Sequence, residues 1–368
     1  MAWVLYRKYR PQKFSEFVGQ EHIVKTLTNA ISSGLISHAY LFYGPRGSGK
    51  TTIARLFAKA INCQNRKKGE FEPCNQCFSC KEISEGRAVD LIEIDAASHR
   101  GIDEIRDLRE GIKFAPTRLK YKVFIIDEAH QLTKEAANAL LKTLEEPPSH
   151  AIFILATTEI HKMIPTIISR CQRFDFRKLT VPEILKKLEI ICQKEKIKIE
   201  KAALELIAQN AQGSMRDAES LLDQVFTSFD KKEVKLEDVK SLLGVVEVKK
   251  IAEFVEMVFS KKTKEAIRFL NDLVEKGEDL EVFGKTLIEY LRKILILKIT
   301  GSSFNPLFGG LTKEEFENLK NQSEKIGESE IKKALELFLE AQNKIKYSPI
   351  PQLPLELAIV EFTESLSD

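Results

Sequence analysis

The segment "GPRGSGKT", residues 44–51, has the spacing G-x-x-x-x-G-K-[ST] of a phosphate-binding loop. It follows the apolar run "AYLFY" and precedes the helical pattern "KTTIARLFAKAI", which is the context that the motif requires. Glycines let backbone N–H groups close around phosphate oxygens, and the N-terminus of the helix favours negative charge. The alternative, a glycine-rich turn with an accidental lysine, fits this context poorly. The candidate nucleotide contacts are Gly44, Pro45, Arg46, Gly47, Ser48, Gly49, Lys50, Thr51 and Thr52.

Within this loop, Lys50 is expected to reach the β- and γ-phosphates, and Thr51 to offer a hydroxyl to Mg²⁺. Two carboxylates, Asp127 and Glu128, end the apolar run "KVFIIDEAH", where open parallel sheets bind ligands. Asp127 is predicted to hold Mg²⁺ through water, and Glu128 to orient or deprotonate an attacking water. Taken alone, the pair could be the solvated start of a helix, but the phosphate loop favours the catalytic interpretation.

The next apolar run, "ILATTE", ends with Thr157 and Thr158. A polar side chain at this point could place the water near the γ-phosphate. A threonine pair at the end of a strand is also a common cap, and the residues alone leave both interpretations open.

Four cysteines have the spacing of a metal site. Cys63 is followed by ten residues, and Cys74, Cys77 and Cys80 then form "CNQCFSC". Four thiolates with no open position predict a structural, tetrahedral Zn²⁺ rather than a catalytic one. An iron–sulfur cluster has less support because its common runs are spaced differently, and the other alternative is four unrelated buried cysteines.

The segment "SRCQRFDF", residues 169–176, places Arg170 beside Cys171. From the residues alone, Arg170 could be a solvated charge, part of a site in its own chain, or a group that acts on another molecule. Cys171 and Cys192 stand apart from the four-cysteine pattern, and both are predicted to be structural thiols.

The composition narrows the class of protein. Hydrophobic residues make up 43% of the 368 residues, and the formal net charge of +3 does not by itself indicate a polyanionic partner. The opening "MAWVLYRKYRPQKF" lacks the apolar region of a secretory signal, and no apolar run approaches the length of a membrane span. We therefore expect a cytoplasmic protein, in which clustered cysteines indicate metal rather than disulfides.

Four short runs, "HAYLFYG", "VDLIEIDA", "KVFIIDEA" and "AIFILATT", are apolar on both faces, as in central strands of a parallel sheet. A fifth run, "RFDFRKL", alternates and suits a sheet edge. Helical patterns lie between most of them, which predicts a doubly wound, five-stranded α/β domain at residues 1–178 with a metal module at 63–80. Strand signals then disappear. Capped helical patterns predict a small helical domain at 179–243, and longer amphipathic helices follow at 244–368.

Together these features resemble the AAA+ ATPases and, more narrowly, the clamp-loader ATPases of the bacterial DNA polymerase III holoenzyme. The opening "RKYRPQKFSEFVGQEHIVKTL", the phosphate loop, the four-cysteine insertion, "FIIDEAHQLTKEAANALLKTLEEPP", "FILATTE" and "SRCQRFDF" follow in that family's order. The resemblance covers at least residues 1–240, and the cysteine insertion is its most discriminating feature. It implies an AAA+ domain, a helical lid, and a helical collar that joins subunits.

The resemblance also implies roles for single residues. Thr157 matches a sensor of the γ-phosphate region, and Arg216 in "GSMRDAE" matches a lid arginine that reports the nucleotide state. Arg170 matches an arginine that acts in trans on ATP held by a neighbouring subunit. The residues expected to flank the base of ATP or ADP are Val18, Arg10 and Pro11.

The implied function is to open a sliding clamp on ATP binding and to release it around primed DNA on hydrolysis. The expected partners are other clamp-loader subunits, further copies of the chain, the clamp, and the backbone of primed DNA without sequence readout. Alternatives are another AAA+ machine such as a branch-migration motor, a nucleotide-binding scaffold without hydrolysis, or a DNA-reading cysteine region. The ending "ESLSD" suits the family's short form or a trimmed chain, because the longer form continues into polymerase- and helicase-binding domains.

Overall fold

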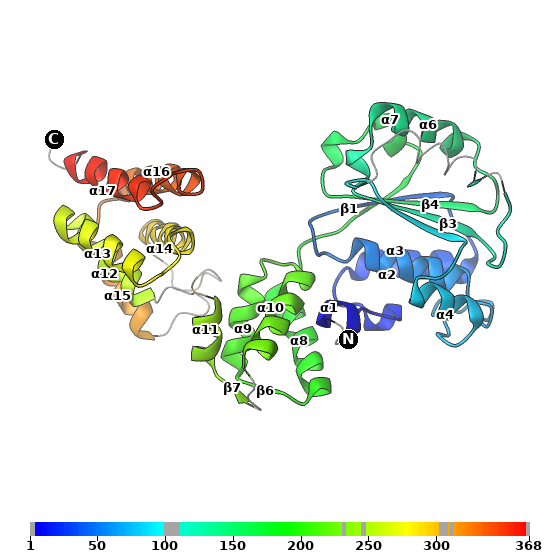
Figure 1. Cartoon of the computed structure of the whole chain (residues 1–368), viewed down its shortest axis with the longest axis horizontal. Coiled ribbons are helices and arrows are strands. Elements are labelled where there is room, and N and C mark those ends of the chain that lie inside the picture. The colour runs from blue at the N-terminus through cyan, green and yellow to red at the C-terminus, as the bar shows by residue number, and fades with distance from the viewer. Residues whose placement is uncertain are drawn as a thin grey trace. The chain divides into compact units, whose positions relative to one another are not determined.

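The computed structural model describes residues 4–98, 111–112, 114–229, 233–243, 248–301, 308 and 313–365 (Figure 1). The chain forms two compact units, Met1–Leu236 and Glu237–Asp368. The expected domain boundaries at 178/179 and 243/244 stay predictions. The second of them adjoins residues 244–247, which lie outside the described residues.

A five-stranded parallel sheet forms the centre of the first unit, as the apolar runs predicted. Its spatial order is β2-β3-β4-β1-β5. The alternating run forms β5, and β5 is an edge strand, as expected. The prediction of a central strand was wrong for β2, which is the other edge strand of the described sheet and has half-buried or exposed side chains because it pairs with β3 alone. The strands are β1 (Ala39–Tyr43), β2 (Leu91–Asp95), β3 (Lys122–Asp127), β4 (Ala151–Thr157) and β5 (Gln172–Asp175).

Helices cover both faces of this sheet (Figure 1). Tyr40 and Phe42 of β1 pack into the core on one face, and Ala39 and Leu41 pack into the core on the other. Burial on both faces explains why the central strands are apolar throughout rather than alternating. The covering helices are α2 (Glu21–Ser33) and α3 (Lys50–Ile61) on the first face, and α6 (Lys134–Glu145) and α7 (Pro165–Ile168) on the second.

Shorter elements connect these layers. A helical turn, α1, and a 3-10 turn, η1, precede α2, and α4 begins after Cys77 and contains Cys80. The bounds are α1 (Leu5–Lys8), η1 (Phe14–Glu16), α4 (Phe78–Glu85), η2 (Ala129–Gln131) and η3 (Ile160–Lys162).

Three helices follow the sheet within the first unit, and two of them, α8 and α10, have the predicted N-terminal caps. The Glu183 carboxylate accepts from the backbone N–H of Thr180 at 2.8 Å, and the Ser214 hydroxyl accepts from the backbone N–H of Asp217 at 3.3 Å. A two-residue parallel pair departs from the all-helical expectation, because strands this short show no periodicity. The elements are α8 (Val181–Glu195), β6 (Lys198–Ile199), α9 (Lys201–Asn210), α10 (Met215–Ser228) and β7 (Glu233–Val234).

The second unit is helical in its described part. Its apolar core includes Phe254, Phe283 and Phe338, and the rings of Phe254 and Phe283 meet edge to face at 5.1 Å between centroids. None of the helices in the described ranges has the length and apolarity needed to cross a membrane. The helices are α11 (Leu236–Leu243), α12 (Val248–Phe259), α13 (Thr263–Glu275), α14 (Leu280–Thr300), α15 (Lys313–Lys325), α16 (Glu328–Ile345) and α17 (Leu353–Ser365).

Candidate nucleotide site and cysteine module

A cavity of about 580 Å³ lies within the first unit, between the phosphate loop, the N-terminal segment and the start of α10. Most of the residues expected around a nucleotide line it. They are Arg10, Pro11, Val18, Arg46, Gly47, Ser48, Gly49, Lys50, Thr51, Thr52, Asp127, Glu128 and Arg216. The structure thus brings together residues from four separate parts of the chain.

The phosphate loop has a backbone that only glycine suits at two points. Gly47 and Gly49 have φ angles of 74° and 98°. A Cβ on Gly47 would lie 1.9 Å from the Ser214 hydroxyl oxygen, and a Cβ on Gly49 would lie 2.4 Å from a ring carbon of Phe17. The loop is therefore closely enclosed by Ser214 at the start of α10 and by Phe17, and its glycine backbone fits a phosphate ligand.

Lys50 is buried at the base of this loop. Its ammonium donates to the carbonyl oxygens of Gly44 and Pro45, at 2.8 and 3.0 Å. Burial lowers the pKa of Lys50, and the negative charges of Glu128 and Asp127 oppose that shift. A phosphate would offer this ammonium a stronger, charge-assisted bond than the two carbonyls do.

Thr51 and Asp127 meet directly. The Thr51 hydroxyl donates to Asp127 Oδ2 at 2.7 Å, so two oxygen donors of the kind that Mg²⁺ prefers lie side by side. Asp95 ends β2 opposite Asp127 in the strand register and also lines the cavity. Sequence reasoning missed Asp95, although the same signal, a carboxylate at the end of an apolar strand, points to it.

The two threonines after β4 have different contacts. The Thr158 hydroxyl donates to Glu128 Oε2 at 2.9 Å. The Thr157 hydroxyl is buried, shares a 2.9 Å hydrogen bond with His130 Nδ1, and accepts from the backbone N–H of Glu159. His130 Nδ1 also lies 3.5 Å from Glu128 Oε2, so His130 lies between Thr157 and Glu128. The role of Thr157 as a sensor stays a prediction.

Arg216 reaches the cavity from the first turn of α10. Its guanidinium lies 5.0 Å from the centroid of the Tyr6 ring, and Tyr6 also lines the cavity. Sequence reasoning missed Tyr6, Lys187 and Glu219 on the cavity wall. Glu219 could have been found, because it occupies a core-facing position of an otherwise apolar helix face.

Glu219 is buried, and this raises its pKa from 4.5 to about 7, although Lys187 opposes the shift. The folded chain binds the Glu219 proton more tightly than the unfolded chain does. As pH rises from about 4.5 to about 7, Glu219 becomes charged, and the free energy of unfolding falls progressively. We expect Glu219→Gln to raise the unfolding free energy by on the order of 3 kcal/mol near pH 8, and much less near pH 5. Denaturant titrations at both pH values measure this. Asp223→Asn, which removes a carboxylate from the same helix, is the matched control, and an equal effect of Glu219→Gln at both pH values would contradict the prediction.

Arg170 is not among the side chains that line the cavity of its own chain. Its guanidinium donates to Glu145 Oε1 at 2.7 Å and to the carbonyl of Thr166 at 2.8 Å, and its side chain is 33% exposed. The arginine is therefore held by local contacts while it stays accessible from outside.

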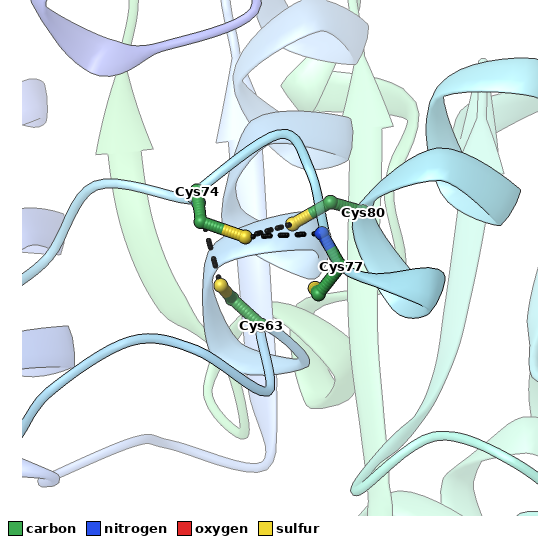
Figure 2. Close-up of side chains that lie close together, drawn as sticks. All are labelled: Cys63, Cys74, Cys77 and Cys80. Carbon is green, nitrogen blue, oxygen red and sulfur yellow. Dashed lines mark hydrogen bonds between the residues drawn. The ribbon is translucent and has the colours of Figure 1, made fainter.

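The four predicted cysteines come together (Figure 2). The sulfur atoms of Cys63, Cys74, Cys77 and Cys80 all lie within 4.8 Å of one another. Although burial acts in the opposite direction, the backbone N–H groups of Gln76 and Cys77 lower the pKa of Cys74 to about 6. Four clustered sulfurs suit a tetrahedral zinc ion. We call residues 63–85, from Cys63 to the end of α4, the cysteine module.

The other two cysteines lie apart from this cluster. Burial raises the pKa of Cys171 and of Cys192 to about 12. Such thiols are unreactive at neutral pH, which agrees with the structural interpretation.

Three family descriptions match successive parts of the chain. "DNA polymerase III, delta subunit" matches residues 19–180, and "DNA polymerase III clamp loader subunit, ATPase lid domain" matches residues 183–228. "DNA polymerase III subunits gamma and tau domain III" matches residues 234–367. A gamma subunit from Buchnera aphidicola is 37% identical over 367 residues, which are 99% of each chain. The chain belongs to the DNA polymerase III gamma/tau family.

The tau relatives are longer than the gamma/tau chain described here. The tau subunit of Bacillus subtilis is 45% identical over 98% of this chain and 63% of its own length. The tau subunit of Escherichia coli is 38% identical over 97% of this chain and 54% of its own length. This chain thus spans between about half and two-thirds of these relatives. A solved Holliday junction branch migration motor, RuvB of Thermotoga maritima, aligns with a TM-score of 0.48 at 20% identity over 68% of this chain and 79% of its own; a likeness of this size says nothing about function.

Proposed function

We propose that this gamma/tau chain is an ATP-hydrolysing subunit of a bacterial clamp loader, which opens the sliding clamp and loads it on primed DNA. The observation that supports this best is the convergence of the phosphate loop with Asp127 and Glu128 at one cavity. A scaffold that only bound nucleotide would not need a carboxylate positioned to act on water. We further propose residues 1–178 as the nucleotide-binding domain, 179–243 as the lid, and 244–368 as the oligomerisation collar.

In this proposal Lys50 binds the β- and γ-phosphates. Thr51 and Asp127 would hold Mg²⁺, which when bound neutralises charge on the phosphate oxygens. Glu128 takes a proton from the attacking water or orients it, and the hydroxyl of Thr158 fixes the orientation of the carboxylate.

The remaining predicted residues keep their proposed roles. Thr157 acts as a sensor through His130, and Arg216 reports nucleotide state from the lid. Arg170 acts on ATP of a neighbouring subunit. The part of the cavity wall that would contact the nucleobase consists of Arg10, Pro11 and Val18. We call it the base-side wall.

The cysteine module is proposed to hold one structural Zn²⁺ through Cys63, Cys74, Cys77 and Cys80. Metal analysis of the reduced protein should find one zinc per chain. Protein free of zinc and of iron, yet folded, would rule out a metal role for the cysteines.

The proposed partners are other clamp-loader subunits, further copies of this chain, the sliding clamp and primed DNA, in the cytoplasm. The test is an ATPase assay of the reconstituted complex. We expect turnover to rise when clamp and primed DNA are present together. A branch-migration motor would respond to DNA alone, and a scaffold would bind ATP without turnover.

A further inference from the structure

The N-terminal segment, residues 10–18, forms one wall of the nucleotide cavity but has little regular structure of its own. Its only element is the 3-10 turn η1, and its residues Arg10, Pro11 and Val18 line the cavity. A short segment of this kind needs contacts from elsewhere to hold one conformation, because ordering each residue costs about 1–2 kcal/mol of backbone entropy.

A carboxylate of the cysteine module supplies such a contact. Glu72 lies two residues before Cys74, and its two oxygens accept from successive backbone N–H groups. Oε2 accepts from Phe14 at 2.9 Å, and Oε1 accepts from Ser15 at 2.8 Å. These donors belong to the first residues of η1 and have no partner within a turn of that length. Glu72 therefore acts as a charged cap across 57 residues of chain.

A second contact joins the same segment to the module and to the phosphate-loop helix. The Gln12 side-chain oxygen accepts from Lys59 Nζ at 2.6 Å and from the Ser84 hydroxyl at 3.3 Å. Lys59 lies on α3 and is only 2% exposed, and Ser84 lies on α4 beyond Cys80. Three parts of the chain thus meet at Gln12.

The segment touches the phosphate loop at its other end. The ring of Phe17 lies so close to Gly49 that a Cβ there would be 2.4 Å from it. Val18, which lines the cavity, directly follows Phe17 in the chain. A displacement of Phe14 and Ser15 would therefore also displace this part of the cavity wall.

We propose that the cysteine module positions the base-side wall of the nucleotide cavity, with Glu72 as the positioning residue. This inference rests on the proposed nucleotide binding at the cavity, and it assigns the module a role in the affinity for ATP. A zinc site that only stabilised the fold would not require this contact, and neither would a module that read DNA.

The test compares the binding of two ligands to the reduced 368-residue chain. One is a fluorescent adenine nucleotide, which uses the base wall and the phosphate loop. The other is inorganic tripolyphosphate, a competitor that uses the phosphate loop alone. Glu72→Ala should weaken the nucleotide about tenfold, since two charged hydrogen bonds are lost, and leave the affinity for tripolyphosphate within about twofold.

Zinc content is measured on every variant. Glu72→Gln, which keeps one acceptor oxygen, should give a smaller loss of nucleotide affinity with zinc retained. Glu70→Ala is the matched control, because its exposed carboxylate accepts from the backbone N–H of Lys67, three residues earlier. Chelation of zinc from the wild-type chain should produce the same selective loss as Glu72→Ala.

The outcomes separate this inference from the proposed function. Unchanged nucleotide affinity in Glu72→Ala with full zinc content would overturn the positioning role, as would an equal loss for both ligands in Glu72→Gln. A wild-type chain that bound neither ligand would instead refute the proposed nucleotide site.

Discussion

Arg170→Ala should lower the clamp- and DNA-stimulated ATP turnover of the assembled complex by ~10³-fold or more, as arginines supplied in trans do in comparable phosphoryl transfers. Arg170 does not line the cavity of its own chain, so its loss should leave the nucleotide affinity of the isolated chain unchanged. The measurements are steady-state turnover of the reconstituted complex and nucleotide titration of the isolated chain.

Arg173 provides a matched control for this experiment. It lies three residues further on, is 45% exposed, and pairs with Asp175 at 2.7 Å. Arg173→Ala should therefore retain most of the turnover. Full turnover in Arg170→Ala would show that the arginine does not act on ATP, and an equal loss of nucleotide affinity would show that it acts within its own chain.

Glu128→Gln should lower turnover by ~10²–10⁴-fold, the range typical of a lost general base. The amide keeps the size of the carboxylate and can still accept from Thr158 Oγ1, so the local geometry should survive. Nucleotide binding should persist, because Lys50 and the backbone of the phosphate loop are unchanged. Single-turnover hydrolysis beside nucleotide titration separates the two effects.

Glu135→Gln, in the exposed first turn of α6, is the matched control and should be neutral. If Glu128→Gln left assembled turnover intact, the assignment of Glu128 as the catalytic base would be wrong. The scaffold alternative would gain support if the wild-type complex bound ATP without hydrolysing it.

Local patterns were sufficient for most of the fold. Three of the four runs apolar on both faces became the central strands β1, β3 and β4, because a parallel sheet covered by helices buries both faces. The fourth run forms β2 at the edge of the sheet, where its side chains are half-buried or exposed. The edge position of β5 followed from its alternation. The two-residue pair of β6 and β7 did not follow, because its pairing joins segments more than thirty residues apart through a few backbone hydrogen bonds.

Contacts between distant residues explain what sequence reasoning missed at the site. Asp95 meets the cavity because the register of β2 places it opposite Asp127. Thr157 and Thr158 are adjacent and chemically alike. Only the structure shows that the Thr158 hydroxyl bonds to Glu128, whereas the Thr157 hydroxyl bonds to His130. The contacts of Glu72 with Phe14 and Ser15 leave no trace in local spacing.

The sequence by itself determined the phosphate loop, the carboxylates that end β3, the four-cysteine cluster and the strand-and-helix order. Each depends on residues close together in the chain, where spacing alone dictates geometry. Only the tertiary structure decided which side chains share the cavity, that Arg170 lies outside it, and that the cysteine module contacts the base-side wall. These depend on how separate elements pack, which the spacing of residues along the chain does not encode.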